Sequence, residues 1–248
     1  ALEVGRWRHE GDAVDPSALR VAVVRFPRIS NATDVDAMAG EAGVGVQVTT
    51  NPGTCQAADI LVLPGSRSTV SDLEWLRRSG IADVVTRRAE QGRTVVGICG
   101  GYQMLCRTIF DPDGQETASG SVIEGLGLLP VEVDFAATKT LALPRGTWRG
   151  IEVGGYEIHH GVCRSLEDAE AFLDGVHVGS VWGTMWHGAF EHDEFRRTWL
   201  ADAARHAGSS WRPHSDEPGY QARREAMIET LADALEAHVD VDRILHLA

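Results

Sequence analysis

The chain has 248 residues, 43% of them hydrophobic, which is enough to bury a core and excludes intrinsic disorder as its main description. The 36 acidic residues outnumber the 23 basic ones and give a formal net charge of −13, which excludes the basic face of a typical nucleic-acid-binding protein. No stretch approaches the roughly 20 consecutive apolar residues of a membrane helix, and the first residues form no signal peptide, so we expect a soluble, cytoplasmic protein.

Four short, β-branched apolar runs in the first hundred residues predict buried strands. Segments compatible with helices lie between them, and the longest, residues 70–91, contains Gly80 as an expected break. Strands that alternate with helices predict an α/β fold with a doubly wound, mostly parallel sheet. The four runs are residues 19–26, 44–49, 59–63 and 94–98.

The pattern changes after about residue 120. Residues 125–133, 151–159 and 180–186 have the composition of strands joined by turns, and they predict an antiparallel extension of the sheet. Two helices are expected to follow, at residues 194–206 and 220–238, the second with an apolar face.

The domain organisation follows from where these patterns begin and end. Residues 1–19 are polar and show no period, and we expect them to be a linker remnant from a preceding domain. Residues 20–248 are expected to form one domain, with a C-terminal helical extension at about residues 209–248.

The cysteines indicate neither a zinc site nor a disulfide framework, because no Cys-x-x-Cys pair occurs. Each thiol is therefore considered alone, either as a buried filler or as a nucleophile. Cys55, Cys106 and Cys163 are expected to be core residues.

The surroundings of Cys99 favour a nucleophile. Residues 97–105, Gly-Ile-Cys-Gly-Gly-Tyr-Gln-Met-Leu, place one reactive side chain among small residues between an apolar strand and a helix. This is the layout of a nucleophile elbow, a sharp strand-to-helix turn that exposes its central side chain. The start of the helix favours the thiolate, and the N–H groups after Cys99 point toward an oxyanion on an attacked carbonyl. The alternative is a buried structural cysteine beside a glycine turn.

A catalytic thiolate needs a base, usually a histidine, and the sequence offers ten. His187 follows the strand-like residues 181–186, and active sites of open α/β sheets gather at strand ends. His159 and His160 close another predicted strand. The residues alone leave the choice between His187 and this pair open.

Six segments occur in an order along the chain that is typical of one enzyme family. In that order they are Phe26–Asn31 followed by Thr33-Asp34; Leu63–Ser66 with Asp72–Leu76; Gly97–Leu105; Gly125–Val131; Gly155–His159; and Trp182–Thr184 with His187-Gly188. Together they resemble class I (triad-type) glutamine amidotransferases, in the branch of the cobyric acid synthases and cobyrinate amidases. The resemblance covers about residues 20–248 and implies a flavodoxin-like fold.

The resemblance implies a glutaminase half-reaction. Cys99 would attack the side-chain amide of glutamine to give a glutamyl thioester and ammonia, with His187 as base and acid. The backbone around Gly65 and the N–H of Gly100 are the implied oxyanion hole. The substrate-binding residues are expected to be Gln103, Lys139 (for the substrate carboxylate), Tyr156, Glu157 and His159.

The sequence departs from the family's usual triad at one position. Most members place a glutamate two residues after the catalytic histidine, where it orients the imidazole, but here that position is Ala189. The cobyric acid branch is similar in lacking this glutamate. The residue that orients His187 stays open, with Glu157 or a backbone carbonyl as candidates. An incompletely oriented base predicts slow hydrolysis until a partner domain closes the site.

Making an amide from a carboxylate needs activation, normally by ATP, but the sequence contains no Gly-x-x-x-x-Gly-Lys-Ser/Thr phosphate loop. We therefore expect no cofactor and no metal in this chain. The resemblance implies that Mg-ATP and a corrinoid acceptor bind to an ATP-dependent synthetase domain that precedes this one, and that glutamine-derived ammonia serves cobalamin biosynthesis.

Three other functions are alternatives to the hypothesis that this chain supplies ammonia for corrinoid amidation. A glutaminase subunit that amidates peptidoglycan lipid II shares the Cys-Gly-Gly-Tyr-Gln motif, but Arg28–Asn31 and Trp182–Gly188 favour the corrinoid branch. A cysteine peptidase or γ-glutamyl hydrolase would use the same thiolate on peptides. A degenerate, non-catalytic domain is supported by the missing glutamate and opposed by the intact Cys99, Gln103 and His187.

Overall fold

The computed structural model describes residues 7–8, 17–166, 169–214, 216–239, 243 and 246. The expected linker, residues 1–19, therefore falls largely outside the described residues. Two of its residues, Trp7–Arg8, form a short strand, β1, which pairs in parallel with β3 (Val44–Thr49).

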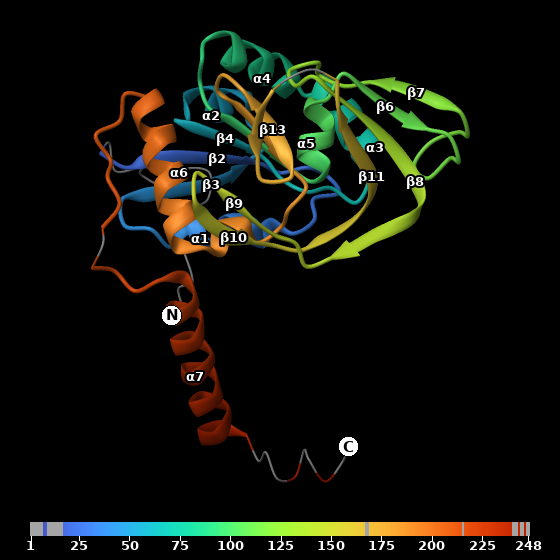
Figure 1. Cartoon of the computed structure of the whole chain (residues 1–248). Helices are drawn as coiled ribbons and strands as arrows, with labels where there is room; N and C mark the ends of the chain where they lie inside the picture. The colour runs from blue at the N-terminus through green and yellow to red at the C-terminus, as the bar shows by residue number, and fades with distance from the viewer. Residues whose placement is uncertain are drawn as a thin grey trace.

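An eight-stranded sheet forms the centre of the molecule (Figure 1). Its order is β1-β3-β2-β4-β5-β14-β13-β12; all pairs from β1 to β14 are parallel, and the last two pairs are antiparallel. The predicted doubly wound, mostly parallel sheet is confirmed. The remaining strands are β2 (Leu19–Val24), β4 (Ile60–Leu63), β5 (Val95–Ile98), β12 (Glu170–Phe172), β13 (Gly175–Val178) and β14 (Val181–Thr184).

Helices connect the parallel strands and pack against the sheet (Figure 1). The predicted helical segment at residues 70–91 consists of α3 (Thr69–Arg78) and α4 (Ile81–Glu90). The break falls at Gly80, as expected, because this glycine adopts a left-handed conformation with φ of 76°. The other helical segments are η1 (Ala32–Val35), α1 (Asp36–Ala39), α2 (Pro52–Ala57), α5 (Gly100–Leu105), η2 (Ala189–Glu191), α6 (Asp193–His206) and α7 (Tyr220–His238).

A second sheet of four strands, in the order β11-β8-β6-β7, extends the fold on one side (Figure 1). Strand β8 pairs antiparallel with β11 and parallel with β6, while β6 and β7 are antiparallel. The expected antiparallel extension is thus present in this region. Its strands are β6 (Thr108–Asp111), β7 (Ser121–Glu124), β8 (Val131–Ala142) and β11 (Glu157–Ser165), and a hairpin of β9 (Arg145–Trp148) and β10 (Ile151–Gly154) lies between β8 and β11 in the chain.

The predicted strand at residues 180–186 belongs to the central sheet and not to the extension, so that part of the prediction is wrong. Strand β14 runs parallel to β5, with Thr184 opposite Ile98. All four residues of β14 are buried, which is typical of a parallel strand covered on both faces. This position brings the residues after β14 to the same sheet edge as Cys99.

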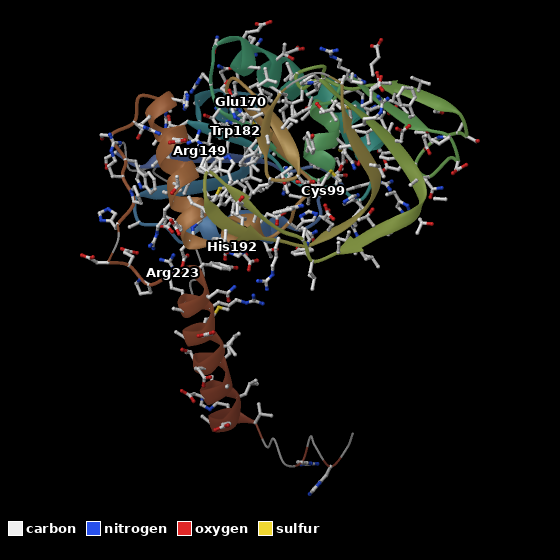
Figure 2. The ribbon with its side chains drawn as sticks, viewed as in Figure 1. Cys99, Arg149, Glu170, Trp182, His192 and Arg223 are labelled. Carbon is white, nitrogen blue, oxygen red and sulfur yellow. The ribbon has the colours of Figure 1, made fainter. Side chains whose placement is uncertain are left out.

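The last helix, α7, projects away from the rest of the molecule (Figure 1), and Figure 2 labels Arg223 in its first turn. Of its residues only Tyr220 is buried. The apolar face expected on this helix is present but exposed at Ile228, Leu231 and Leu235. Among the helices of the described residues, none has the length and apolar character needed to cross a bilayer.

Candidate active site

The chain turns sharply at Cys99, between β5 and α5, inside the body of the molecule (Figure 2). Cys99 has a φ of 51°, a strained conformation for a residue with a side chain. The turn requires small neighbours, because a Cβ atom on Gly101 would lie 1.9 Å from the carbonyl oxygen of Leu63 in β4. This is the geometry of a nucleophile elbow.

His187 lies just beyond β14 and is the histidine that the fold brings to Cys99. Its Nδ1 is 2.6 Å from Oδ2 of Asp34, and Oδ1 of Asp34 accepts a hydrogen bond from the N–H of Gly188 at 2.9 Å. Both side chains are buried, with 1% of His187 and 3% of Asp34 exposed. Cys99 and the imidazole line the same cavity, and Cys99 is close enough to raise the pKa of the ring. Asp34, His187 and Cys99 thus form one series of neighbouring groups.

The charge of His187 follows from these partners. Burial by itself lowers the pKa of the imidazole, but the hydrogen bond with Asp34, the neighbouring Cys99 and the charges of those two groups raise it to about 10. At neutral pH the ring is therefore an imidazolium. A neighbouring imidazolium favours the thiolate form of a cysteine, which is the nucleophilic form.

Asp34 occupies the place of the orienting residue that the sequence left open. It belongs to η1, 153 residues before His187. Glu157, which was a candidate for this place, instead has its Oε1 3.9 Å from Nε2 of His159. Asp34 stood in the segments that carried the family resemblance, but no local pattern distinguishes it from a surface aspartate. Only the fold shows its partner.

Tyr156 packs its ring against the imidazole of His187 and is not among the residues that line the pocket. The two rings stack with centroids 5.2 Å apart and an angle of 25° between their planes. Their backbones pair as well, through Tyr156 N–H to His187 O at 3.0 Å and His187 N–H to Tyr156 O at 2.9 Å. Tyr156 was expected to bind substrate, which stays a prediction; in the structure its contacts hold the imidazole in place.

The two backbone segments expected to form the oxyanion hole lie side by side. A Cβ atom on Gly100 would be 2.9 Å from the backbone nitrogen of Ser66, and one on Gly65 would be 3.0 Å from Cε1 of His187. Glycine at both positions lets the loop after β4 and the first turn of α5 approach each other closely. The loop after β4 therefore lies against both the first turn of α5 and the ring of His187.

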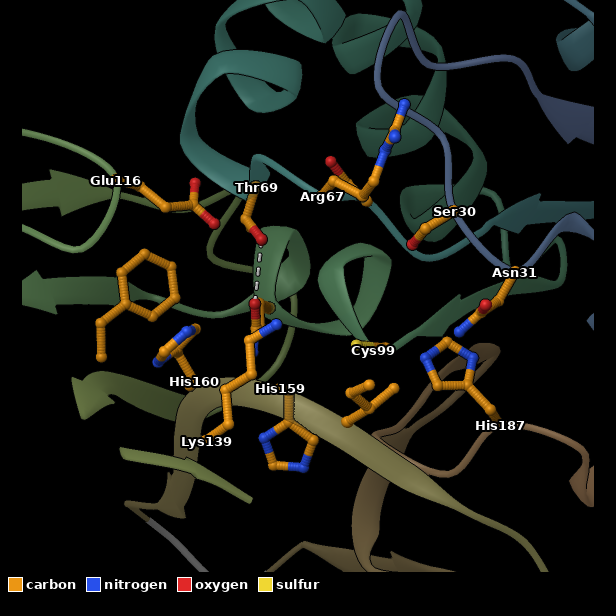
Figure 3. Close-up of a pocket in the computed structure, with 15 residues that line it drawn as sticks. Ser30, Asn31, Arg67, Thr69, Cys99, Glu116, Lys139, His159, His160 and His187 are labelled. Carbon is orange, nitrogen blue, oxygen red and sulfur yellow. Dashed lines mark hydrogen bonds between the residues drawn. The ribbon is translucent and has the colours of Figure 1, made fainter. Parts of the chain in front are cut away.

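A cavity of about 420 Å³ opens over the thiol (Figure 3). Buried Gln103 forms part of its wall, and its Oε1 accepts a hydrogen bond from Oγ1 of Thr69 at 3.1 Å. Of the predicted site residues, Cys99, Gln103, Lys139, His159 and His187 line this cavity, and Glu157 lies beside it next to His159. The other lining residues are Ser30, Asn31, Ser66, Arg67, Thr69, Glu116, Phe135, Ile158, His160 and Gly161.

An irregularity in the second sheet carries Lys139 to this cavity. The register of β8 and β11 changes from Thr140 opposite His159 to Phe135 opposite Gly161, so residues 136–139 bulge out of the ladder. Lys139 is exposed and is the only lysine of the sequence. The close-up shows its side chain among the residues that line the pocket, on the part of the wall with His159 and His160 (Figure 3).

His159 is a predicted site residue whose buried ring nitrogens are not satisfied by the protein residues that the structure describes. Neither of its ring nitrogens has a hydrogen-bond partner among the described residues, although both are buried. Burial lowers its pKa, against the raising effect of Glu157, so the ring is neutral at neutral pH. A neutral imidazole here can exchange a hydrogen bond with a bound ligand.

The other cysteines are separated from this chemistry. Burial raises the pKa of Cys55 to about 11 and that of Cys106 to about 12, and it also raises the pKa of Cys163. None of the three lines the cavity. In the part of the chain that the structure describes, no three His, Cys, Asp or Glu side chains are grouped as metal ligands.

Comparison with known proteins agrees with this geometry. Residues 20–195 match the model of the CobB/CobQ-like glutamine amidotransferase domain. The chain is 94% identical over 247 residues to a cobyric acid synthase of Cutibacterium acnes, covering 100% of this chain and 51% of that protein. It is 48% identical to a cobyric acid synthase of Mycolicibacterium gilvum, covering 100% of this chain and 48% of that protein. The chain thus spans about half the length of these relatives.

Solved structures show the same fold. A crystal structure of a glutamine amidotransferase superimposes with a TM-score of 0.58 at 19% identity, covering 76% of this chain and 98% of the other. The structure of PurLQS from Thermotoga maritima gives a TM-score of 0.52 at 16% identity, covering 77% of this chain and 96% of the other. The expected class I amidotransferase fold is confirmed.

Proposed function

The chain belongs to the CobB/CobQ-like glutamine amidotransferase family, and on this basis we propose that it hydrolyses glutamine at Cys99 and supplies ammonia for amide formation elsewhere. The observation that carries this proposal is the series Asp34–His187–Cys99, in which His187 and Cys99 line a cavity. A thiolate, a proton carrier and an orienting carboxylate are the parts that acyl transfer needs.

In the first step the Cys99 thiolate attacks the side-chain carbonyl carbon of glutamine. Negative charge develops on the carbonyl oxygen, where backbone N–H groups of the Gly65 loop and of Gly100 stabilise it. His187, an imidazolium at neutral pH, gives its proton to the amide nitrogen as the C–N bond breaks. The products are a glutamyl thioester and ammonia.

The second step releases glutamate. His187 is neutral after the first step, so it can take a proton from a water molecule that attacks the thioester carbonyl. The C–S bond then breaks, and the Cys99 thiolate and the His187 imidazolium are restored together. Each cycle consumes one glutamine and one water and yields glutamate and ammonia.

Asp34 acts through His187 and is a positioning residue. Its hydrogen bond to Nδ1 fixes the ring so that Nε2 serves the sulfur and the leaving nitrogen. The bond from Gly188 N–H holds the carboxylate itself in place. This arrangement supplies the orientation that a glutamate at the position of Ala189 gives in other class I members.

The cavity walls offer groups for the rest of the substrate. We assign Lys139 to the α-carboxylate of glutamine; this role is supported by its position on the cavity wall, in the bulge at residues 136–139. Gln103 and His159 contribute polar groups to the same cavity. These contacts would hold the amide against the sulfur.

We infer that the ammonia goes to a carboxylate that ATP has activated on a synthetase partner. The relatives are named cobyric acid synthases and are about twice as long as this chain. We place Mg-ATP and the corrinoid acceptor on the other half of such a protein, which acts as the synthetase partner. This chain then contributes glutaminase chemistry and no cofactor.

Glutamate release from L-glutamine tests the proposal. The wild-type chain should release glutamate, Cys99→Ala should release none, and His187→Ala should fall by at least about 100-fold. His206→Ala, which removes an exposed imidazole from α6, is the matched control and should keep full activity. If the chain is silent alone, the assay is repeated with the other half of a cobyric acid synthase, and silence in both settings contradicts the proposal.

A further inference from the structure

The last helix carries apolar side chains that none of the described residues covers. In α7 (Tyr220–His238) every residue from Ile228 onward is exposed. Three of these residues are large and apolar, with Ile228 50%, Leu231 40% and Leu235 56% exposed. Their spacing of three and four residues places them on one side of the helix. They form the apolar stripe of α7, and apolar side chains gathered in this way mark an interaction surface.

Negative charge borders the apolar stripe on one side. At about 3.6 residues per turn, four carboxylates lie together on the side of α7 next to the stripe. They are Glu225, Glu229, Asp233 and Glu236. None of the four takes part in an ion pair among the described residues. A surface complementary to this helix therefore has an apolar groove with basic side chains along one rim.

The base of α7 is fastened to the rest of the chain, so contacts set the direction in which the helix leaves. The N–H of Tyr220 donates a hydrogen bond to Oδ1 of Asp193 at 2.9 Å, and the Tyr220 side chain is buried. The guanidinium of Arg223 lies 3.4 Å from Oε2 of Glu217 and 4.0 Å from Oε1 of Glu41. The apolar stripe begins past these contacts, where α7 projects from the molecule (Figure 1).

The base of α7 and the first described strand lie at the same edge of the central sheet. Trp211 Nε1 donates a hydrogen bond at 2.8 Å to the carbonyl oxygen of Ala42, in the turn that leads into β3. A Cβ atom on Gly40, in the same turn, would lie 3.2 Å from Nη2 of Arg223. Strand β3 also pairs with β1 (Trp7–Arg8). Because these two strands are parallel, the chain enters β1 at the end of β3 that lies near the base of α7.

The apolar stripe needs a partner, and a second copy of this chain fits poorly. A helix of about 15 residues is marginally stable in water without tertiary contacts. Three large apolar side chains are far fewer than the roughly 20–30 residues a side of a stable interface between separate proteins. A surface in the same polypeptide needs less area, because tethering holds it at an effective concentration on the order of millimolar. The cobyric acid synthases that match this chain are about twice as long, so their other half offers such a surface.

We propose that the apolar stripe of α7 docks against the other half of a full-length cobyric acid synthase, in an apolar groove with a basic rim. The helix then joins the two halves, because its base is fixed to this domain at Tyr220 while its stripe is covered by the partner half. The carboxylates beside the stripe pair with the rim and set the orientation of the contact. This proposal adds a docking surface to the proposed function and does not depend on the glutaminase chemistry.

Hydrogen exchange of the backbone amides of α7 tests the proposal. It is measured on this chain alone and on a joined protein, in which the chain replaces the matching half of the Cutibacterium acnes cobyric acid synthase, to which it is 94% identical. Residues 224–238 should exchange at least about tenfold more slowly in the joined protein, because docking stabilises the helix. Leu231→Gln combined with Leu235→Gln should abolish this difference, since glutamine keeps the helix propensity of leucine but is costly to bury in an apolar groove.

The matched control places the same side chains on the opposite side of α7. Ala226→Gln combined with Ala237→Gln changes two exposed positions and leaves the apolar stripe intact. In the joined protein this variant should keep the slow exchange of the wild type.

Three results would overturn the proposal. The first is equal exchange of α7 in the chain alone and in the joined protein, and the second is slow exchange that survives in the Leu231 and Leu235 variant. The third is protection of the chain alone that grows with its concentration, which assigns the stripe to a second copy. Exchange is measured without glutamine, so a failure of the glutaminase proposal leaves this test unaffected.

Discussion

The carboxylate of Asp34 and the imidazole of His187 are 2.6 Å apart although 153 residues of chain separate them. Both groups are almost fully buried, so each depends on the other for a hydrogen-bond partner and for charge balance. The turn that places Asp34 includes Asn31, which has a φ of 48°. Asparagine tolerates this left-handed conformation better than other residues with a side chain, so Asn31 suits the turn.

Asp34→Asn should lower kcat for glutamine hydrolysis by at least about 100-fold, because an amide can hold the wrong tautomer of the ring and cannot balance the imidazolium charge. KM should change little, since Asp34 does not line the cavity. Steady-state glutamate release measures both parameters. Asp83→Asn, an exposed carboxylate on α4, is the control. Loss of kcat to the same extent in both variants would contradict the assigned role.

The pKa of His187 predicts how stability depends on pH. The folded chain raises this pKa from 6.5 to about 10, so it binds the proton more tightly than the unfolded chain does. The resulting contribution to the free energy of unfolding is fully present below pH 6.5 and is lost as the pH rises through about 10. Urea unfolding across this range should show the decline, and Asp34→Asn should show a smaller one. Identical declines in the two proteins would refute the linkage.

Lys139→Met should raise KM for glutamine by about tenfold while kcat changes little, since the lost ion pair contributes to binding rather than to the reacting bond. Arg145→Met removes an exposed charge outside the cavity and should leave KM unchanged. Because Lys139 is the only lysine, an amine-directed reagent offers a second readout. Glutamine should slow its modification, and absence of protection would argue against contact with the substrate.

The buried ion pair of Glu41 and Arg196 should matter for stability and not for chemistry. Glu41 Oε1 accepts hydrogen bonds from Nε of Arg196 at 2.9 Å and Nη2 at 2.5 Å, and both side chains are at most 1% exposed. Glu41→Gln removes the buried one of the two carboxylates that pair with Arg196, the other being Asp193, and should lower the free energy of unfolding by about 2 kcal/mol. Denaturant unfolding measures this value.

The matched control is Glu74→Gln, which breaks an exposed pair with Arg78 on α3. Exposed pairs contribute little, so the change should be below about 1 kcal/mol. Equal effects of the two substitutions would show that burial does not set the strength of the Glu41 pair.

Local signals explain what the sequence predicts well. The parallel strands β2 to β5 are short apolar runs bounded by turn residues, and the break at Gly80 is a single-residue signal. The elbow at Cys99 also is local, because nine consecutive residues carry the strand end, the small turn and the helix start. Such features depend on neighbours in the chain and need no knowledge of the tertiary fold.

The features that the sequence does not reveal all depend on contacts between distant segments. Asp34 finds His187 only when η1 packs beside the end of β14, and Glu116 reaches the cavity only when its loop meets α3. Strand β14 resembles the strands of the extension in composition, and its parallel pairing with β5 is a property of the topology. The same pairing brings His187, and not His159 or His160, to the end of the strand beside Cys99, which answers the choice of base that the residues alone leave open.

The covalent intermediate is the most direct test of the account. The wild-type chain is mixed with L-glutamine, quenched with acid within the first turnovers, digested, and examined by mass spectrometry. The account predicts a mass increase of one glutamyl group on the peptide that contains Cys99, and no increase in Cys99→Ser or on peptides with Cys55, Cys106 or Cys163. Glutamate release without any adduct on the Cys99 peptide, or an adduct that persists in Cys99→Ser, would contradict it.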